Sequence, residues 1–134
     1  MKDMKVMKEN KSKFSYLSNK IIGCAIEVHK TLGPGLLESA YQQCFCHELR
    51  LSNINFKMEV PLPVNYKNCY LDCGYRIDIL VENDIIVELK SVEKLRKIHE
   101  AQILSYMKLA NIQQGFLINF NVELLKNGLK SFIL

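Results

Sequence analysis

Three charged residues interrupt an apolar segment near the middle of the chain. The segment RIDILVENDIIVELK covers residues 76–90 and sets Asp78, Glu88 and Lys90 among β-branched and long aliphatic side chains. Carboxylate oxygens are the ligands that hard divalent cations prefer, and an ammonium group can compensate the charge of nearby carboxylates. The three residue types could therefore form a metal site or an ion-pair cluster, provided that the fold brings them together.

The alternation of side chains along two strands predicts that the charges share one face of a sheet. That face carries Arg76, Asp78, Leu80, Ile86, Glu88 and Lys90. The opposite face is predicted to belong to the core because all its residues are hydrophobic, namely Tyr75, Ile77, Ile79, Val81, Ile85, Val87 and Leu89.

The register of the two strands decides whether the carboxylates meet. A three-residue turn at 82–84 pairs Val81 with Ile85 and places Asp78 directly opposite Glu88, with Cβ atoms about 5 Å apart. A two-residue turn would put the two carboxylates on opposite sides. The fully apolar face favours the first register, because a slip of one residue would expose half of it.

Two carboxylates that face each other on a sheet repel, so something must compensate them. Lys90 is one candidate, and a bound divalent cation is another. A surface ion-pair cluster of Arg76, Asp78, Glu88 and Lys90 is the plainer alternative, and it would contribute little to stability. The pattern alone leaves these alternatives open.

The rest of the chain predicts an α/β fold with a mixed sheet flanked by helices. The strand that follows the long third helix should return parallel to the second hairpin strand by a right-handed crossover. Residues 1–13 are predicted to form a flexible N-terminal tail, and residues 14–134 a single domain. The expected helices cover residues 14–32, 36–51 and 92–110, and the expected strands lie within 56–68, 70–81, 85–91, 115–120 and the end of the chain.

The composition indicates which partners, which state of the cysteines and which location to expect. The chain has 134 residues and a formal charge of +4, which permits an anionic partner without requiring one. Its five cysteines lack the usual metal-site spacing, so reduced thiols are expected. No apolar run is long enough for a membrane helix, and the Lys-rich start lacks a signal-type apolar core, so we expect a cytoplasmic protein without a membrane partner.

These residues resemble a known nuclease superfamily. Asp78, followed after a hairpin by Glu88-Leu89-Lys90, resembles the signature of the PD-(D/E)xK nucleases. The stretch GPGLLESAY, with Gly35, Glu38 and Tyr41, matches the motif that names the GxxExxY family of that superfamily. The order of elements agrees with the restriction-endonuclease-like αβββαβ core.

The resemblance extends from about residue 14 to residue 120, with Ile77 in place of the proline that often precedes the aspartate. It implies that Asp78, Glu88 and the Leu89 carbonyl hold Mg²⁺ or Mn²⁺, and that Lys90 orients or activates the attacking water. Such an ion stabilises charge on a phosphate and lowers the pKa of bound water.

The resemblance also gives roles to two residues of the second helix. It implies that Glu38 is a site carboxylate that binds the metal directly or through water. The alternative is an ordinary glutamate in the first turn, stabilised by the helix dipole. Tyr41 is expected to pack, or to support the site by a hydrogen bond.

His99, Gln102 and Tyr106 fall on one face of the third helix. Gln102 and Tyr106 are similar to the QxxxY element of RecB-like nucleases, where it lies beside the metal and contacts nucleic acid. The alternative is a polar stripe on an amphipathic helix. Basic residues at 94–97 could meet phosphates.

The sequence thus predicts a Mg²⁺- or Mn²⁺-dependent nuclease that hydrolyses phosphodiester bonds, with DNA favoured over RNA as the partner. A catalytically silent nucleic-acid-binding or regulatory module with the same fold is the alternative, and an interaction protein with a structural ion cluster is a third. A small nuclease core often needs a second subunit to hold its polymer, which allows a homodimer.

Overall fold

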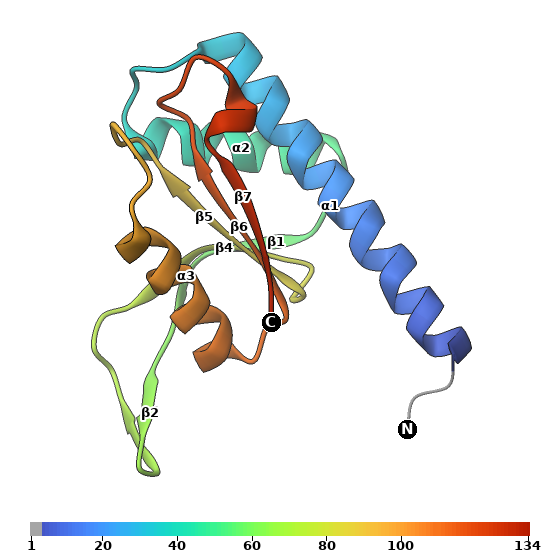
Figure 1. Cartoon of the computed structure of the whole chain (residues 1–134), viewed down its shortest axis with the longest axis vertical. Coiled ribbons are helices and arrows are strands. Elements are labelled where there is room, and N and C mark those ends of the chain that lie inside the picture. Colours follow the sequence, from blue (N-terminus) through green and yellow to red (C-terminus); the bar gives the residue numbers. More distant parts are fainter. Residues whose placement is uncertain (1–3) are drawn as a thin grey trace.

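The computed structural model describes the backbone of residues 4–134 and the side chains of residues 16–134 (Figure 1). Its helices are α1 (Met4–Leu32), α2 (Glu38–Leu51), α3 (Lys97–Ala110) and the short 3₁₀ helix η1 (Leu125–Asn127). Its strands are β1 (Phe56–Pro61), β2 (Val64–Tyr66), β3 (Cys69–Leu71), β4 (Arg76–Val81), β5 (Ile85–Lys90), β6 (Gln114–Asn119) and β7 (Leu129–Ile133).

The main sheet has five strands in the order β1-β4-β5-β6-β7, while β2 and β3 form a separate hairpin. β5 and β6 are parallel and are joined through α3, whereas the other neighbouring pairs are antiparallel. This confirms the predicted mixed sheet flanked by helices. It also confirms the parallel return after the third helix.

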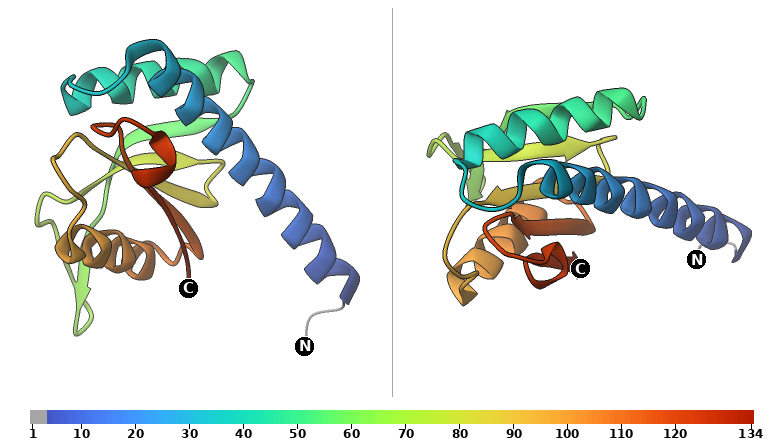
Figure 2. Two further views of the ribbon diagram at one scale, coloured as in Figure 1. Left: turned by 45° about the horizontal axis from the view of Figure 1, so that its top comes forward. Right: turned by 90° about the horizontal axis from the view of Figure 1, so that it is seen from above.

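The helices cover the two faces of this sheet, as Figures 1 and 2 show. α1 and α2 lie on one face and α3 on the other, so two apolar clusters form, one on each side of the sheet. The first contains Ile21, Val28, Tyr41, Phe45, Leu49, Ile79, Val87, Leu89, Phe116 and Phe120 among others. The second contains Leu62, Ile77, Ile86, Ile103, Tyr106, Met107 and Leu117.

Helix α1 begins at Met4, ahead of the predicted start at residue 14. Residues 4–13, which the sequence assigned to a tail, therefore lie in the helix, while residues 1–3 of that tail lie outside the described part. Lysine, methionine and glutamate favour helices, and no proline or glycine precedes Gly23. Within the described residues, no helix combines the length and apolar character needed to cross a membrane.

The third helix starts later than predicted. α3 begins at Lys97 and not at residue 92, because the Asn119 amide holds the backbone of Val92. Asn119 Oδ1 accepts from the Val92 N–H at 3.0 Å, and Asn119 Nδ2 donates to the Val92 carbonyl at 2.9 Å. Side-chain bonds of this kind compete with helical hydrogen bonds.

The predicted strand over 70–81 is divided in two. β3 ends at Leu71, and β4 begins at Arg76. Between them Gly74 has a φ of +79°, and its N–H donates to Asp72 Oδ1 at 3.0 Å. This turn separates the projecting β2–β3 hairpin from the main sheet.

The strand alternation also fails at the start of β4. Tyr75 and Ile77 were predicted to share a face with Ile79, but Ile77 packs in the α3 cluster and the Tyr75 ring lies 5.9 Å from that of Tyr106. Regular pairing of β1 with β4 is interrupted where Glu59 faces Asp78. Glu59, which stands at this interruption, has a φ of +51°, a value outside the range of a regular strand.

Candidate active site

The turn between β4 and β5 has the length that the sequence predicted. Val81 pairs with Ile85, and the Asp84 N–H donates to the Val81 carbonyl at 2.9 Å. Glu82 and Asn83 both adopt positive φ values, +53° and +58°, as a tight hairpin requires. The predicted register is therefore confirmed.

Asp78 and Glu88 lie together where the backbone pairing of these strands ends. The register runs as far as Ile79 opposite Val87. Beyond it, the Asp78 N–H donates to Glu88 Oε1 at 3.4 Å, and the Leu89 N–H donates to Asp78 Oδ2 at 2.9 Å. The two carboxylates thus converge, and each accepts a hydrogen bond from a backbone N–H of the opposing strand.

Burial gives Glu88 an unusual protonation state. Its side chain is 4% exposed, and burial, together with the hydrogen bond and charge of Asp78, raises the pKa of Glu88 to about 10. The Asp78 N–H and the positive charge of Lys90 lower this pKa only in part. Without a cation, Glu88 therefore keeps a proton at neutral pH.

The Leu89 carbonyl is directed toward the same pair. The N–H and C=O of one residue in a strand point to the same side, and the Leu89 N–H meets Asp78. On the opposite side of β5, the Lys90 carbonyl accepts from the Phe120 N–H at 3.0 Å. The orientation of Leu89 thus agrees with the ligand role that the resemblance implied.

Lys90 is connected to α3 by a chain of polar groups. Its Nζ donates to Gln102 Oε1 at 3.3 Å, and Gln102 Nε2 donates to the Tyr106 hydroxyl oxygen at 3.2 Å. Burial raises the pKa of Tyr106, and the nearby Glu88 charge adds to this effect. The structure therefore brings both residues of the QxxxY element to the lysine.

His99 lines the same cavity as Gln102 and Tyr106, so the three residues share the predicted helix face, but no hydrogen bond joins it to them among the described residues. Its Nδ1 accepts a hydrogen bond from the Arg96 N–H at 2.9 Å, which caps the start of α3. Lys90 lines this cavity as well.

Glu38 begins α2 and faces the same region. Burial raises its pKa, the Lys90 charge lowers it, and the Asp78 and Glu59 charges raise it further. Among the residues that the structure describes, no three His, Cys, Asp or Glu side chains are close enough to hold a metal ion by themselves. The electrostatic interactions of Glu38 with Lys90, Asp78 and Glu59 show that it lies next to the Asp78–Glu88 pair.

Tyr41 closes the loop between α1 and α2. Its buried hydroxyl donates to the Gly33 carbonyl at 2.6 Å and accepts from the Leu36 N–H at 3.1 Å. The ring stacks on Phe120 with centroids 4.6 Å apart. Gly35 in the same loop has a φ of +101°, which glycine adopts readily. The ring therefore packs in the core, as expected, and the hydroxyl bonds with the loop that precedes α2.

Sequence reasoning missed Gln42 and Glu59 as neighbours of the site. Gln42 is buried, and its Nε2 donates to Glu59 Oε1 at 2.8 Å and to the Asp78 carbonyl at 3.5 Å. Gln42 lies four residues after Glu38 on the same helix face, which was a usable signal. The positive φ of Glu59 has no comparable mark in the sequence.

The comparison with known families agrees with this geometry. Residues 15–132 match the family model described as PD-(D/E)XK nuclease superfamily. The chain belongs to the PD-(D/E)XK nuclease superfamily. The matched range includes the converging carboxylates, the lysine and both faces of the sheet. Searches of curated proteins and of solved structures gave no significant match.

PD-(D/E)XK nucleases generally use divalent metals, and the donors present here suit such an ion. Mg²⁺ is commonly held by one or two carboxylates, with water and substrate phosphate completing its shell. Asp78 and Glu88 supply two adjacent carboxylates, and burial together with the hydrogen bond and charge of Asp78 raises the pKa of Glu88 to about 10. Within the described part of the chain no cysteine belongs to a group of metal-binding side chains, and all five are free: Cys24 and Cys46 are buried, Cys44 is half-buried, and Cys69 and Cys73 are exposed.

Proposed function

We propose that this chain is a metal-dependent nuclease of the GxxExxY family, which hydrolyses phosphodiester bonds of DNA in preference to RNA. The observation that carries the proposal is the convergence of Asp78 and Glu88 beside Lys90. Membership of the nuclease superfamily supports it independently.

Asp78, Glu88 and the Leu89 carbonyl would hold Mg²⁺ or Mn²⁺. A divalent ion in that position neutralises charge on a phosphate and makes water a better nucleophile. Glu88 must lose its proton before it can bind the ion, because its pKa lies near 10 in the metal-free protein. Metal binding and deprotonation of Glu88 are therefore linked.

Lys90 would orient the attacking water and stabilise the negative charge that develops on the phosphate. Gln102 holds the lysine ammonium through Oε1, and Tyr106 orients the Gln102 amide through its hydroxyl. These two hydrogen bonds hold the flexible Lys90 side chain in place before the substrate binds. Its positive charge is then already positioned for catalysis.

Glu38 would act on water next to the pair or bind the metal through a water molecule. Its position at the first residue of α2 and its interaction with Lys90 and Asp78 support this role. Tyr41 would keep the start of α2 in place by closing the preceding loop.

A second candidate is a catalytically silent nucleic-acid-binding module with the nuclease fold. One observation favours it: among the described residues the carboxylate pair has no third tightly grouped acidic, histidine or cysteine side chain. Such a site would bind an ion more weakly and could serve regulation without turnover.

Cleavage of labelled single-stranded, duplex and flapped DNA in Mn²⁺, Mg²⁺ or EDTA tests the proposal. Cleavage by the wild-type protein should require a metal and should be lost in Asp78→Asn and Lys90→Met. The exposed residue Glu93 provides the control, because Glu93→Gln should cleave like the wild type.

Melting temperatures separate the candidates. A rise with Mn²⁺ that Asp78→Asn abolishes, without cleavage of any substrate, would favour the silent module. Undiminished cleavage by Asp78→Asn would contradict the proposed metal site.

A further inference from the structure

An open cavity of about 610 Å³ lies beside Lys90, between α3 and the base of the β2–β3 hairpin. Its walls include Val64, Tyr75, Ile98 and Tyr106. The volume is in the range that accommodates a small organic group such as a nucleoside. Because Lys90 belongs to both the cavity and the carboxylate site, a group bound here would adjoin the reacting phosphate.

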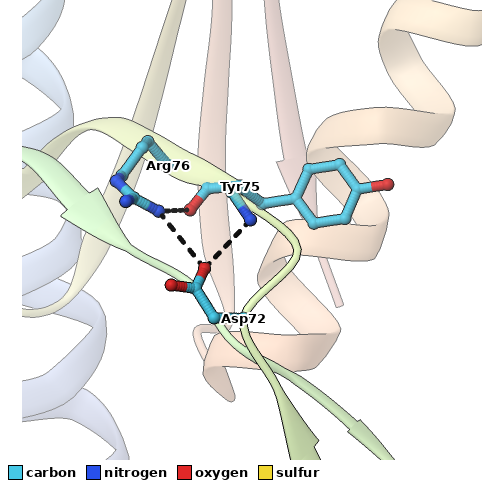
Figure 3. A network of polar contacts seen from close by, with 4 residues as sticks. Asp72, Tyr75 and Arg76 are labelled. Carbon is cyan, nitrogen blue, oxygen red and sulfur yellow. Dashed lines mark hydrogen bonds and ion pairs between the residues drawn. The ribbon is translucent and has the colours of Figure 1, made fainter.

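Tyr75 is presented to this cavity by a polar network. Arg76 Nη1 donates to the Tyr75 carbonyl at 2.8 Å and lies 3.9 Å from Asp72 Oδ1, which also accepts from the Gly74 N–H. Figure 3 shows the Tyr75 ring directed toward α3, away from this network. The ring is 44% exposed, so a fixed backbone carries an accessible aromatic surface.

The β2–β3 hairpin extends the aromatic surface outward. Val64 pairs with Leu71 and Tyr66 with Cys69, and paired residues on alternate positions share one face of a hairpin. Val64 lines the cavity, so Tyr66 lies farther out on the same face. The Tyr66 ring is 60% exposed and has the Lys67 ammonium 5.4 Å from its centre. In Figure 1 this hairpin projects from the sheet beyond α3.

Positive charge borders the cavity at the start of α3. Lys94, Arg96 and Lys97 are exposed and precede the cavity residue Ile98. The nearby acidic residue Glu100 is paired with Lys130 at 3.3 Å. A polymer that places flat rings on the tyrosines and phosphates near these cations would match both features.

We infer that the cavity and the Tyr66 face of the hairpin bind an unpaired nucleic-acid strand, whose bases stack on Tyr75 and Tyr66. In a duplex the bases stack on one another, and their flat faces are not available to protein side chains. Base stacking on aromatic side chains is the usual means of binding single strands. The inference rests on the proposed function and narrows its substrate to single-stranded or flapped nucleic acid.

Fluorescence anisotropy in EDTA tests the inference without requiring cleavage. The probes are a labelled oligothymidine, its duplex with oligoadenine, and the RNA counterpart of the single strand. Tyr75→Leu and Tyr66→Leu remove the aromatic faces while keeping apolar bulk. Tyr16→Leu is the matched control, because Tyr16 is 58% exposed on α1, on the other side of the sheet. Melting temperatures confirm that each variant is folded.

The wild-type protein should bind the single strand more tightly than the duplex. Tyr75→Leu and Tyr66→Leu should each bind the single strand at least about fivefold more weakly than the wild type, while their duplex binding should be unchanged. Tyr16→Leu should match the wild type. Tighter binding of the DNA or the RNA single strand than of the duplex supports the inference.

Equal or tighter binding of the duplex, or a Tyr75→Leu protein that binds like Tyr16→Leu, would overturn the inference. Cleavage restricted to uninterrupted duplex would overturn it as well while leaving the proposed nuclease activity intact. Single-strand binding that depends on Tyr75 without any cleavage would support the inference and count against the nuclease proposal alone.

Discussion

Replacing Glu88 with glutamine should stabilise the metal-free protein and remove its stabilisation by Mn²⁺. Glu88 is 4% exposed and has a pKa of about 10 when no ion is bound, so it is held in its neutral form at pH 7. A glutamine amide has the same shape and offers an N–H donor toward Asp78. It carries no cost of protonation.

The expected gain follows from the pKa difference between the two states. In the unfolded chain the Glu88 carboxyl has its ordinary pKa of 4.5. At pH 7 folding must therefore add a proton against about 2.5 pH units, each worth about 1.4 kcal/mol. Glu88→Gln should raise the free energy of unfolding by about 3.5 kcal/mol, which corresponds to about 12 °C in melting temperature for a chain of this size.

The pH dependence has a definite sign. Because the folded pKa of Glu88 is raised, its contribution to stability is fully present below pH 4.5 and is lost as the pH rises toward about 10. The advantage of Glu88→Gln over the wild type should therefore grow by about 1.4 kcal/mol per pH unit across the neutral range. Urea unfolding in EDTA at several pH values measures it, and taking the difference between proteins cancels other titrating groups.

The exposed Glu93 again supplies the control, since Glu93→Gln should change stability little at any pH. Adding Mn²⁺ should stabilise the wild type and Glu93→Gln, but not Glu88→Gln. If Glu88→Gln were less stable than the wild type at pH 7, or if their difference did not vary with pH, Glu88 would be ionised in the metal-free fold. The reasoning about the carboxylate pair would then be refuted.

Four further substitutions have clear expected outcomes. Lys90→Met should reduce cleavage at least about 100-fold while the Mn²⁺-induced rise in melting temperature persists, and loss of that rise would show that the lysine organises the metal site itself. Tyr41→Phe should lower the free energy of unfolding by about 1–2 kcal/mol in urea titrations, because it removes the hydroxyl that closes the α1–α2 loop; an unchanged midpoint would contradict this role. Gly128→Ala should destabilise the fold because the added Cβ would overlap the Asn119 carbonyl oxygen. Gly23→Ala has open space on α1 and should stabilise the fold by about 0.5–1 kcal/mol. Calorimetry that gives both variants the same sign of stability change would refute this contact argument.

The carboxylate site could be predicted because its determinants are local. The apolar run on either side of residues 82–84 specifies a hairpin with one strongly preferred register, and that register brings Asp78 to Glu88. The helix spacing of Gln102 and Tyr106 was also sufficient to place both toward one side.

The sequence-based predictions failed where residues far away in the sequence influence the local backbone conformation. The late start of α3 depends on Asn119, a residue that follows the helix and reaches back to Val92. The change of face in β4 coincides with the positive φ of Glu59 in the neighbouring strand, and glutamate gives no sequence signal for that conformation. The helix spacing of Gln42 from Glu38 indicated its face, but its partners Glu59 and Asp78 come from two other elements and could not be read from that spacing.

Glu38 and Tyr41 belong to one short motif, but Tyr41 holds the loop before α2 whereas Glu38 faces the candidate site. The Tyr41 hydroxyl bonds with the loop that precedes α2, and Ser91 Oγ donates to the Leu36 carbonyl of that loop at 2.6 Å, which ties the loop to the end of β5. Among the residues whose side chains the structure describes, Glu38 makes no hydrogen bond in this loop. A library of variants sorted for soluble expression should thus retain the tyrosine and accept many residues at position 38, whereas sorting for DNA degradation should retain both.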